Sequence, residues 1–266
     1  MTQPLVSVII PAYNSGKHIK ECLDSVMNQT FQNWEAIVVL APSTDNTFEI
    51  LRGYFRETRI KIIREKCKSN CATARNIGSS KSTGDYIAFL DSDDWWEPMK
   101  LEVQVAYMEA HPELDWTMHR LIVRSGAKDE IWKVPDSPYL GEDILLLGGL
   151  WTILFKAGML DDIKKNWGYL FNERMNHTDD ADLVMRVWEY RYELIPSVLS
   201  GFRRNPDGLT SKANGFLESD LTTLGIALRN HRYSLLSFAL FKNIVMTAIN
   251  ELTGIDWVKW KKEMFG

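Results

Sequence analysis

The sequence has few cysteines and no excess of positive charge. Its 266 residues include three cysteines, Cys22, Cys67 and Cys71, and an odd number does not make a disulfide framework. No second ligand pair accompanies Cys67 and Cys71 to complete a zinc site. The formal net charge is −4 and the sequence pI is about 5.8, without the domain-wide basic face of nucleic-acid-binding proteins. We therefore expect a reduced, cytoplasmic protein that does not bind nucleic acid.

Long apolar runs are also missing. The chain enters a strand-like run at Leu5 without the basic segment and apolar core of a signal peptide. The most apolar late stretch, residues 235–249, is interrupted by Lys242 and Asn243. It falls short of the roughly 18 residues that a membrane-spanning helix requires. We predict neither a signal peptide nor a transmembrane segment.

Glycine-rich phosphate loops are absent from the expected places. No Gly-x-Gly-x-x-Gly follows a predicted strand, and no Gly-Lys-Ser/Thr loop is present, which disfavours dinucleotide dehydrogenases and P-loop NTPases. A nucleotidyltransferase is disfavoured too, because the Gly-rich loop and downstream Lys of such enzymes do not follow the first predicted strand.

What the sequence does contain is a regular alternation of strands and helices. Apolar runs predict buried strands at 5–10, 34–40, 60–63 and 86–90, and amphipathic patterns predict helices from Gly16 and at 45–56 and 72–81. Strands that alternate with such helices imply right-handed crossovers and parallel pairing. The fold class is therefore α/β, with a Rossmann-like, mostly parallel sheet and helices on both faces.

The second half follows a different pattern. After a helix at 98–110, shorter strands of a mixed sheet are expected at 116–123, 131–134 and 151–155, and a helix at 180–190. Two helices are expected from Phe216 onward. We divide the chain into a main domain, 1–212, and a C-terminal helical extension, 213–266. Within the main domain, we expect 1–97 to form a nucleotide-binding half and 98–212 to hold the second substrate.

Three carboxylates follow the strand at 86–90 directly. Asp91, Asp93 and Asp94 thus lie at the carboxyl end of a strand, where open α/β sheets bind ligands. Asp91 and Asp93 are two apart, a spacing that sends both side chains the same way in extended backbone. Mg²⁺ or Mn²⁺ would relieve their repulsion and share its oxygen ligands with substrate phosphates. An acidic turn that caps the helix beginning near Pro98 is an equally open alternative at this point.

Five motifs, in order, resemble the signatures of a known family. They are residues 7–14 (SVIIPAYN), 43–47 (STDNT), 74–76 (ARN), 89–94 (FLDSDD) and 179–183 (DDADL). Over roughly residues 5–205 the chain is similar to family 2 inverting glycosyltransferases with a GT-A fold. The resemblance implies an enzyme that moves a sugar from a nucleoside diphosphate donor, expected to be UDP, to a glycan or lipid-linked sugar in cell-surface polysaccharide synthesis.

The resemblance also assigns roles to individual residues. Asp180 matches the catalytic base, and Asp93 matches the ligand of a Mn²⁺ or Mg²⁺ cofactor. The nucleotide-binding positions are Pro11, Ala12, Tyr13, Asn14, Ala41, Asp45, Arg75, Asp91 and Ser92. Simpler interpretations stay open: Tyr13 as a surface aromatic in a turn, Arg75 as a solvated ion pair, and Asp179, Asp180 and Asp182 as helix caps, which we prefer for Asp182.

Two positions depart from the family pattern. Ala41 stands where an aspartate commonly reads the uracil, and Asn205 stands where a histidine is often a metal ligand. These departures keep a second hypothesis open, a non-catalytic module that binds a sugar nucleotide or a glycan and has kept the fold.

The C-terminal tail is rich in tryptophan and lysine. Trp257, Trp260 and Phe265 are interleaved with Lys259, Lys261 and Lys262. Such segments can lie at a bilayer interface, which predicts a weak peripheral contact with the inner face of the plasma membrane through residues 250–266. A helix packed on the catalytic domain with a solvated basic face is the alternative.

Overall fold

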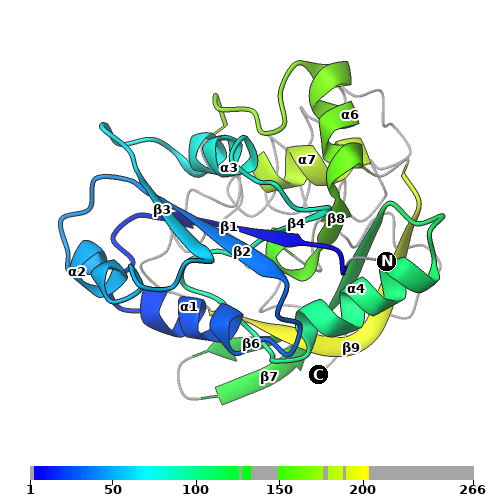
Figure 1. The fold of residues 1–266 in the computed structure, drawn as a ribbon, viewed down its shortest axis with the longest axis horizontal. Coiled ribbons are helices and arrows are strands. Elements are labelled where there is room, and N and C mark those ends of the chain that lie inside the picture. Colours follow the sequence, from blue (N-terminus) through cyan, green and yellow to red (C-terminus); the bar gives the residue numbers. More distant parts are fainter. Residues whose placement is uncertain (1–2, 126–127, 133–148, 176–178, 188–189, 204–266) are drawn as a thin grey trace, which may run out of the picture.

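A computed structural model describes residues 3–125, 128–132, 149–175, 179–187 and 190–203 (Figure 1). The predicted first half is confirmed. Its elements are β1 (Val6–Ala12), α1 (Ile19–Met27), β2 (Trp34–Leu40), α2 (Thr47–Arg52), β3 (Ile60–Arg64), α3 (Cys71–Ser79) and β4 (Tyr86–Phe89). The four strands pair in parallel in the order β3-β2-β1-β4, so their carboxyl ends share one edge.

The second half extends the same sheet with antiparallel and parallel pairs. It contains β5 (Trp95–Trp96), α4 (Lys100–Ala110), β6 (Trp116–Ser125), β7 (Lys128–Trp132), η1 (Leu150–Thr152), β8 (Leu154–Lys156), α6 (Ala157–Trp167), α7 (Asp179–Val187) and β9 (Tyr192–Arg203). The strand order is β3-β2-β1-β4-β8-β6-β9-β5, and β7 pairs with β6. β8 pairs antiparallel with both β4 and β6, which joins the two halves into one mixed sheet.

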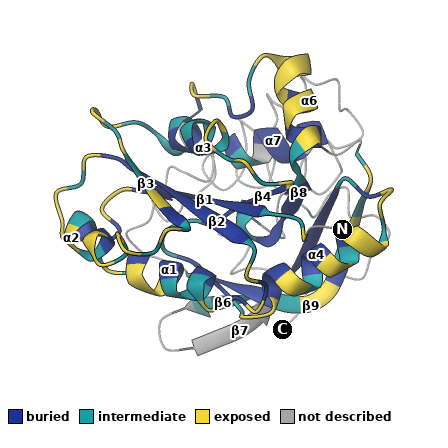
Figure 2. Ribbon diagram, in the orientation of Figure 1, coloured by how far each residue is buried: buried dark blue, intermediate teal, exposed yellow. Residues whose placement is uncertain are grey.

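Two apolar cores lie on opposite faces of this sheet. Along β1, Val8 and Ile10 belong to the core shared with α1 and α4, whereas Ile9 belongs to the core shared with α6 and α7. This alternation is the period of two that a strand imposes. Every residue of β1 and β2 is buried, because helices cover both faces (Figure 2).

Several predicted boundaries were wrong. The helix expected at 45–56 is shorter, Thr47–Arg52, and Phe55 is 59% exposed rather than inward. Phe55 lies in the turns beyond the helix and meets Phe48 edge to face. The strand expected at 151–155 is a 3₁₀ turn followed by the short β8. The helix expected at 180–190 is described over Asp179–Val187, and residues 188–189 lie outside the described residues.

Three elements were missed, namely the short strand β5, the helix α6 and the long strand β9. β9 runs parallel beside β6, with an irregular register near Arg120. The expected helices beyond Phe216, the boundary at 212, Asn205 and the tail all lie outside the described residues. Within the described residues, no helix is long and apolar enough to cross a membrane.

Candidate active site

The acidic stretch after β4 forms a turn at the carboxyl edge of the sheet. The N–H of Asp94 donates to the carbonyl of Asp91 at 3.0 Å, so the extended geometry that the spacing suggested was wrong. Asp91, Ser92 and Asp93 are partly exposed, and Asp94 is buried. The turn therefore presents the carboxylates of Asp91 and Asp93 outward. The buried carboxylate of Asp94 holds the turn in place, because it accepts a hydrogen bond from the N–H of Arg203.

The turn carries more negative charge than its surroundings neutralise. Burial and the nearby Asp91 carboxylate raise the pKa of Asp93 from 3.8 to about 6, although the Arg203 guanidinium opposes the shift. Burial and the same neighbouring acids raise the pKa of Asp94 well above its ordinary value. A carboxylate with a raised pKa gains from a cation placed beside it.

The donor set suits a hard divalent cation that shares its ligands with a substrate. Among the described residues, no group of three or more His, Cys, Asp or Glu side chains forms a complete metal cage. Mg²⁺ and Mn²⁺ are commonly held by one or two carboxylates together with waters and substrate phosphates. The outward carboxylates of Asp91 and Asp93 fit that pattern, so the residues present fit the implied metal.

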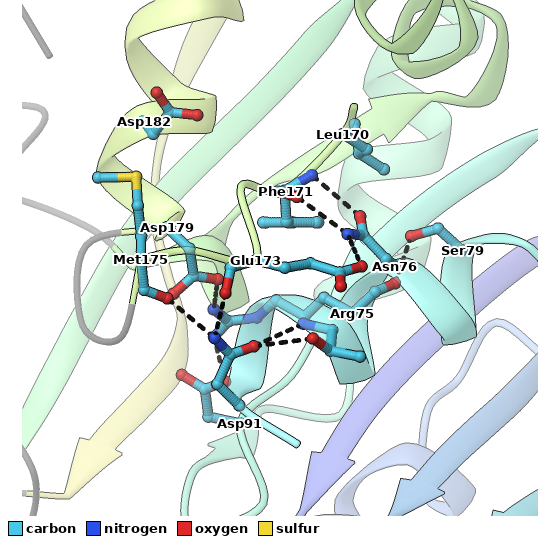
Figure 3. Close-up of polar contacts among 12 residues, drawn as sticks. Arg75, Asn76, Ser79, Asp91, Leu170, Phe171, Glu173, Met175, Asp179 and Asp182 are labelled. Atoms are coloured by element: carbon cyan, nitrogen blue, oxygen red, sulfur yellow. Dashed lines mark hydrogen bonds and ion pairs between the residues drawn. The ribbon is translucent and has the colours of Figure 1, made fainter. Parts of the chain in front are cut away.

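Arg75 connects this turn to the start of α7. Its guanidinium donates to Asp91 Oδ1 at 2.6 Å and to Asp179 Oδ2 at 2.7 Å (Figure 3). The Arg75 side chain is 5% exposed and that of Asp179 is 4% exposed, so this ion pair is shielded from water. The alternative of a solvated ion pair is therefore wrong, and the nucleotide-binding role of Arg75 stays a prediction.

Asp180 follows Asp179 in the first turn of α7 and is partly exposed. The neighbouring Asp182 is buried in the first turn of α7 and forms an ion pair with Arg186 at 2.7 Å, a structural role beyond that of a helix cap. Arg186 also donates to the carbonyl of Leu170 at 2.6 Å. These contacts fix the helix and leave Asp180 as its partly exposed acid.

The loop after β1 is tied to both neighbouring loops of the same edge. Asn14, with φ of 48°, accepts from the N–H of Thr44 at 2.8 Å. Ser15 Oγ lies 2.6 Å from Ser92 Oγ, which joins the loop to the acidic turn. Tyr13 is 41% exposed and lies under Lys68 Nζ, 4.4 Å from the ring centroid.

The remaining predicted nucleotide positions lie at the ends of β1 and β2. Pro11 and Ala12 are the last residues of β1 and are buried. Ala41 is 4% exposed and donates its N–H to Ala12 O at 2.9 Å. Asp45 is exposed, and its carboxylate accepts from the N–H of Gly16 at 2.8 Å. The structure thus brings all the predicted residues to one edge of the sheet.

Sequence reasoning missed three residues that support this edge. Ser15 joins the first loop to the acidic turn, Arg203 donates to Asp93 O at 3.1 Å, and Asn70 caps α3. Only Asn70 carries a local signal, because Asn is a preferred residue immediately before the first turn of a helix. The other two act across long sequence separations.

Several known proteins resemble this chain in sequence. A family model described as Glycosyl transferase family 2 matches residues 7–170. WfgD of Escherichia coli, a UDP-Glc:alpha-D-GlcNAc-diphosphoundecaprenol beta-1,3-glucosyltransferase, is 42% identical over 109 residues, which cover 41% of this chain and 42% of WfgD. Glycosyltransferase GlyG of Streptococcus pneumoniae serotype 4 is 41% identical over 91 residues, covering 34% of this chain and 30% of GlyG. The chain thus matches less than half the length of each of these two relatives.

Solved structures share the fold. TarS of S. aureus, residues 1–349 in complex with UDP-GlcNAc, matches with a TM-score of 0.69 and 24% identity, covering 84% of this chain and 66% of TarS. Mannosyltransferase PcManGT from Pyrobaculum calidifontis, in complex with GDP-Man and Mn²⁺, matches with a TM-score of 0.62 and 20% identity. The match covers 84% of this chain and 65% of PcManGT. These likenesses confirm the predicted GT-A type architecture.

Proposed function

This chain belongs to glycosyl transferase family 2, and from that premise we propose that it is a metal-dependent inverting glycosyltransferase. The donor is a nucleoside diphosphate sugar, UDP-linked, and the acceptor is a glycan or lipid-linked sugar in cell-surface polysaccharide synthesis. The observation that carries the proposal is the Arg75 bridge, which holds the acidic turn and the Asp179-Asp180 pair at one edge of the sheet. WfgD, named for a UDP-Glc donor and a diphosphoundecaprenol-linked acceptor, supports both substrate classes.

The proposed reaction is a single displacement. Asp180 accepts the proton of the acceptor hydroxyl while that oxygen attacks the anomeric carbon. The bond from the anomeric carbon to the diphosphate oxygen breaks, and its electron pair leaves with the diphosphate. Attack from the opposite face inverts the anomeric centre. Bound Mn²⁺ or Mg²⁺, held by Asp93, would neutralise charge on the departing diphosphate.

The other side chains bind and orient the donor. Tyr13 packs against the base, and Asp91 contacts the ribose or a metal-bound water. Asp91 keeps its orientation because Arg75 holds one of its oxygens at 2.6 Å. Asn14 and Asp45 shape the loop around the nucleotide through their hydrogen bonds to Thr44 and Gly16.

A second candidate function is binding without turnover. Ala41 favours it, because this buried position carries no carboxylate to read the base. The buried Ala41 N–H is already bonded to Ala12 O, so the base would be recognised by other groups at this edge. Measuring turnover beside binding separates the two candidates.

The test is a screen of nucleotide sugars with and without Mn²⁺. UDP-glucose, UDP-N-acetylglucosamine and GDP-mannose are offered to the natural chain and to Asp93→Ala, and binding and nucleotide release are both measured. We expect Mn²⁺-dependent binding and slow release of UDP from one UDP-sugar, with both lost in Asp93→Ala. Binding without release favours the module. Mn²⁺-dependent affinity retained in Asp93→Ala contradicts the metal assignment.

A further inference from the structure

Asn76 of α3 forms a closed pair of hydrogen bonds with a distant segment of the chain. Its Nδ2 donates to Phe171 O at 2.9 Å, and its Oδ1 accepts from the N–H of Phe171 at 2.9 Å (Figure 3). The same Nδ2 lies 2.9 Å from Glu173 Oε1. One amide side chain therefore satisfies both backbone groups of Phe171, which has no strand partner to do so.

Asn70 reaches the same segment from the start of α3. Its Oδ1 accepts from the N–H of Thr73 at 2.9 Å and caps the helix. Its Nδ2 donates to Glu173 O at 2.7 Å and to Met175 O at 3.2 Å. The oxygen of the Asn70 amide thus caps α3, and its nitrogen binds the segment on the other side of the site.

The segment held in this way leads directly to the base-carrying helix. Only residues 176–178 separate Met175 from Asp179, where α7 begins. Arg75, on the same helix as both asparagines, holds Asp179 at 2.7 Å. Consequently α3 fixes both the approach to α7 and its first residue, while the other contact of Arg75 holds Asp91.

We propose that Asn70 and Asn76 are positioning residues that set where Asp180 stands relative to the donor. The inference rests on the proposed function, in which Asp180 is the general base. A base must lie within hydrogen-bond reach of the proton it takes. A displacement of about 1 Å can cost on the order of 10²-fold in rate, so small shifts of the segment should matter.

The variant Asn70→Asp isolates this role. Aspartate keeps the acceptor for the N–H of Thr73, so the cap survives, while an oxygen replaces the amide that donates to Glu173 O and Met175 O. Asn76→Asp likewise keeps the acceptor for Phe171 N–H and loses the donor. Each variant is made in the natural chain and in Asp180→Asn, which completes a double-mutant cycle.

The measurements are the kcat of UDP release, with UDP-glucose and UDP-N-acetylglucosamine in Mn²⁺, and the Kd of UDP. We expect each asparagine variant to lower kcat about 10-fold in the natural chain and to leave the Kd of UDP within about 2-fold. In the Asp180→Asn background, each asparagine substitution should lower kcat by less than about 2-fold further, because the base through which Asn70 and Asn76 act is gone. Hydrogen exchange should rise in residues 171–187.

Asn33→Asp is the matched control. The amide of Asn33 also donates to two carbonyls, Gln3 O at 2.8 Å and Pro4 O at 3.0 Å, beside the amino end of β1. This substitution removes the same chemistry far from Asp180, so it should lower thermal stability and leave kcat unchanged.

Each remaining outcome is decisive. An equal loss of kcat in both backgrounds, or no loss in either, overturns the positioning role while Asp180 remains the base. If Asp180→Asn itself releases UDP at the natural rate, the base assignment in the proposed function is wrong, and nothing is left for the two asparagines to position.

Discussion

Arg75 is the residue at which the two chemical parts of the site meet. It forms ion pairs with two carboxylates separated from it by 16 and 104 positions, and its side chain is almost fully buried. Removing one member of a buried ionic group leaves an uncompensated charge, which is strongly unfavourable. The two halves of the site are therefore held in place by electrostatics as well as by the chain.

The partly exposed Asp180 provides the first prediction. Asp180→Asn keeps the shape of the side chain and removes the proton acceptor, so we expect transfer to fall by at least about 10²-fold with donor affinity unchanged. Asp162→Asn, on an exposed position of α6, is the control and should retain full rate. Steady-state release of UDP and calorimetric binding of UDP check both. Near-normal turnover by Asp180→Asn would leave this acid as a helix-terminal charge.

Asp93 provides a prediction about stability and pH in the metal-free protein. Its folded pKa is raised from 3.8 to about 6, so the folded state binds the proton more tightly than the unfolded state. Stability then falls as pH rises from about 4 to 6 and stays lower above. We expect Asp93→Asn, measured in EDTA, to be more stable than the natural chain at pH 7.5 by on the order of 2 kcal/mol. The difference in stability between Asp93→Asn and the natural chain should vanish near pH 4. An equal gain in stability at pH 4 and at pH 7.5 would contradict the prediction.

At the scale of elements, the predictable helices and strands are those whose own sequence shows a clear hydrophobic pattern. The strands of the first half are covered on both faces and therefore appear as continuous apolar runs, as Trp34–Leu40 does. The strand β9 has no such pattern, because it contains Pro196 and alternates irregularly between exposed and buried positions. The helix α6 opens with Ala157 and Gly158 and lacks a side-chain cap, so its start has no clear signal.

The site followed the same rule. The acidic residues were found because their motifs are contiguous, whereas the contact between Arg75 and Asp179 joins residues 104 positions apart. The turn at Asp91 was mispredicted as extended because β4 ends at Phe89, before the carboxylates. Local patterns therefore selected the candidate residues, and the packing of distant segments determines what those residues contact.

The contact between α3 and β1 leads to a prediction about two glycines. A Cβ added at Gly78 would lie 2.4 Å from Ile9 Cγ2, whereas one added at Gly158 of α6 would meet nothing within 4 Å. Gly78→Ala should destabilise by about 1–3 kcal/mol because overpacking exceeds the gain in helix propensity. Gly158→Ala should be neutral or stabilise by up to about 1 kcal/mol. Urea unfolding compares the stability of the two variants. Equal stabilisation by Gly78→Ala and Gly158→Ala would show that α3 can move away from the sheet.

At the scale of the whole molecule, residues 250–266 place three lysines among three aromatic side chains in a chain that is acidic overall. We predict weak association with anionic membranes through residues 250–266, since Trp257 and Trp260 suit headgroup depth and Lys259 suits anionic lipid. The full chain and a truncation after Asn250 are co-sedimented with anionic and with neutral vesicles. Binding should need both the tail and the anionic lipid. Equal binding by both proteins would exclude the tail.

In the proposed function, the donor site is assembled from the turn after β4, α3 and α7, so a bound donor nucleotide should stabilise the whole fold. UDP and Mn²⁺ at about 100 times the Kd contribute about 2.7 kcal/mol, which corresponds to roughly 5–10 °C in Tm for a domain of this size. At pH 5 protons compete for Asp93, whose pKa is about 6, and a metal needs the ionised carboxylate. We therefore expect a large shift at pH 7.5 and a much smaller one at pH 5, with none for Asp93→Ala. The Tm shift is measured by thermal unfolding with UDP, either in Mn²⁺ or in EDTA. A Tm shift that does not depend on Mn²⁺ or on pH would mean that UDP binds without Asp93.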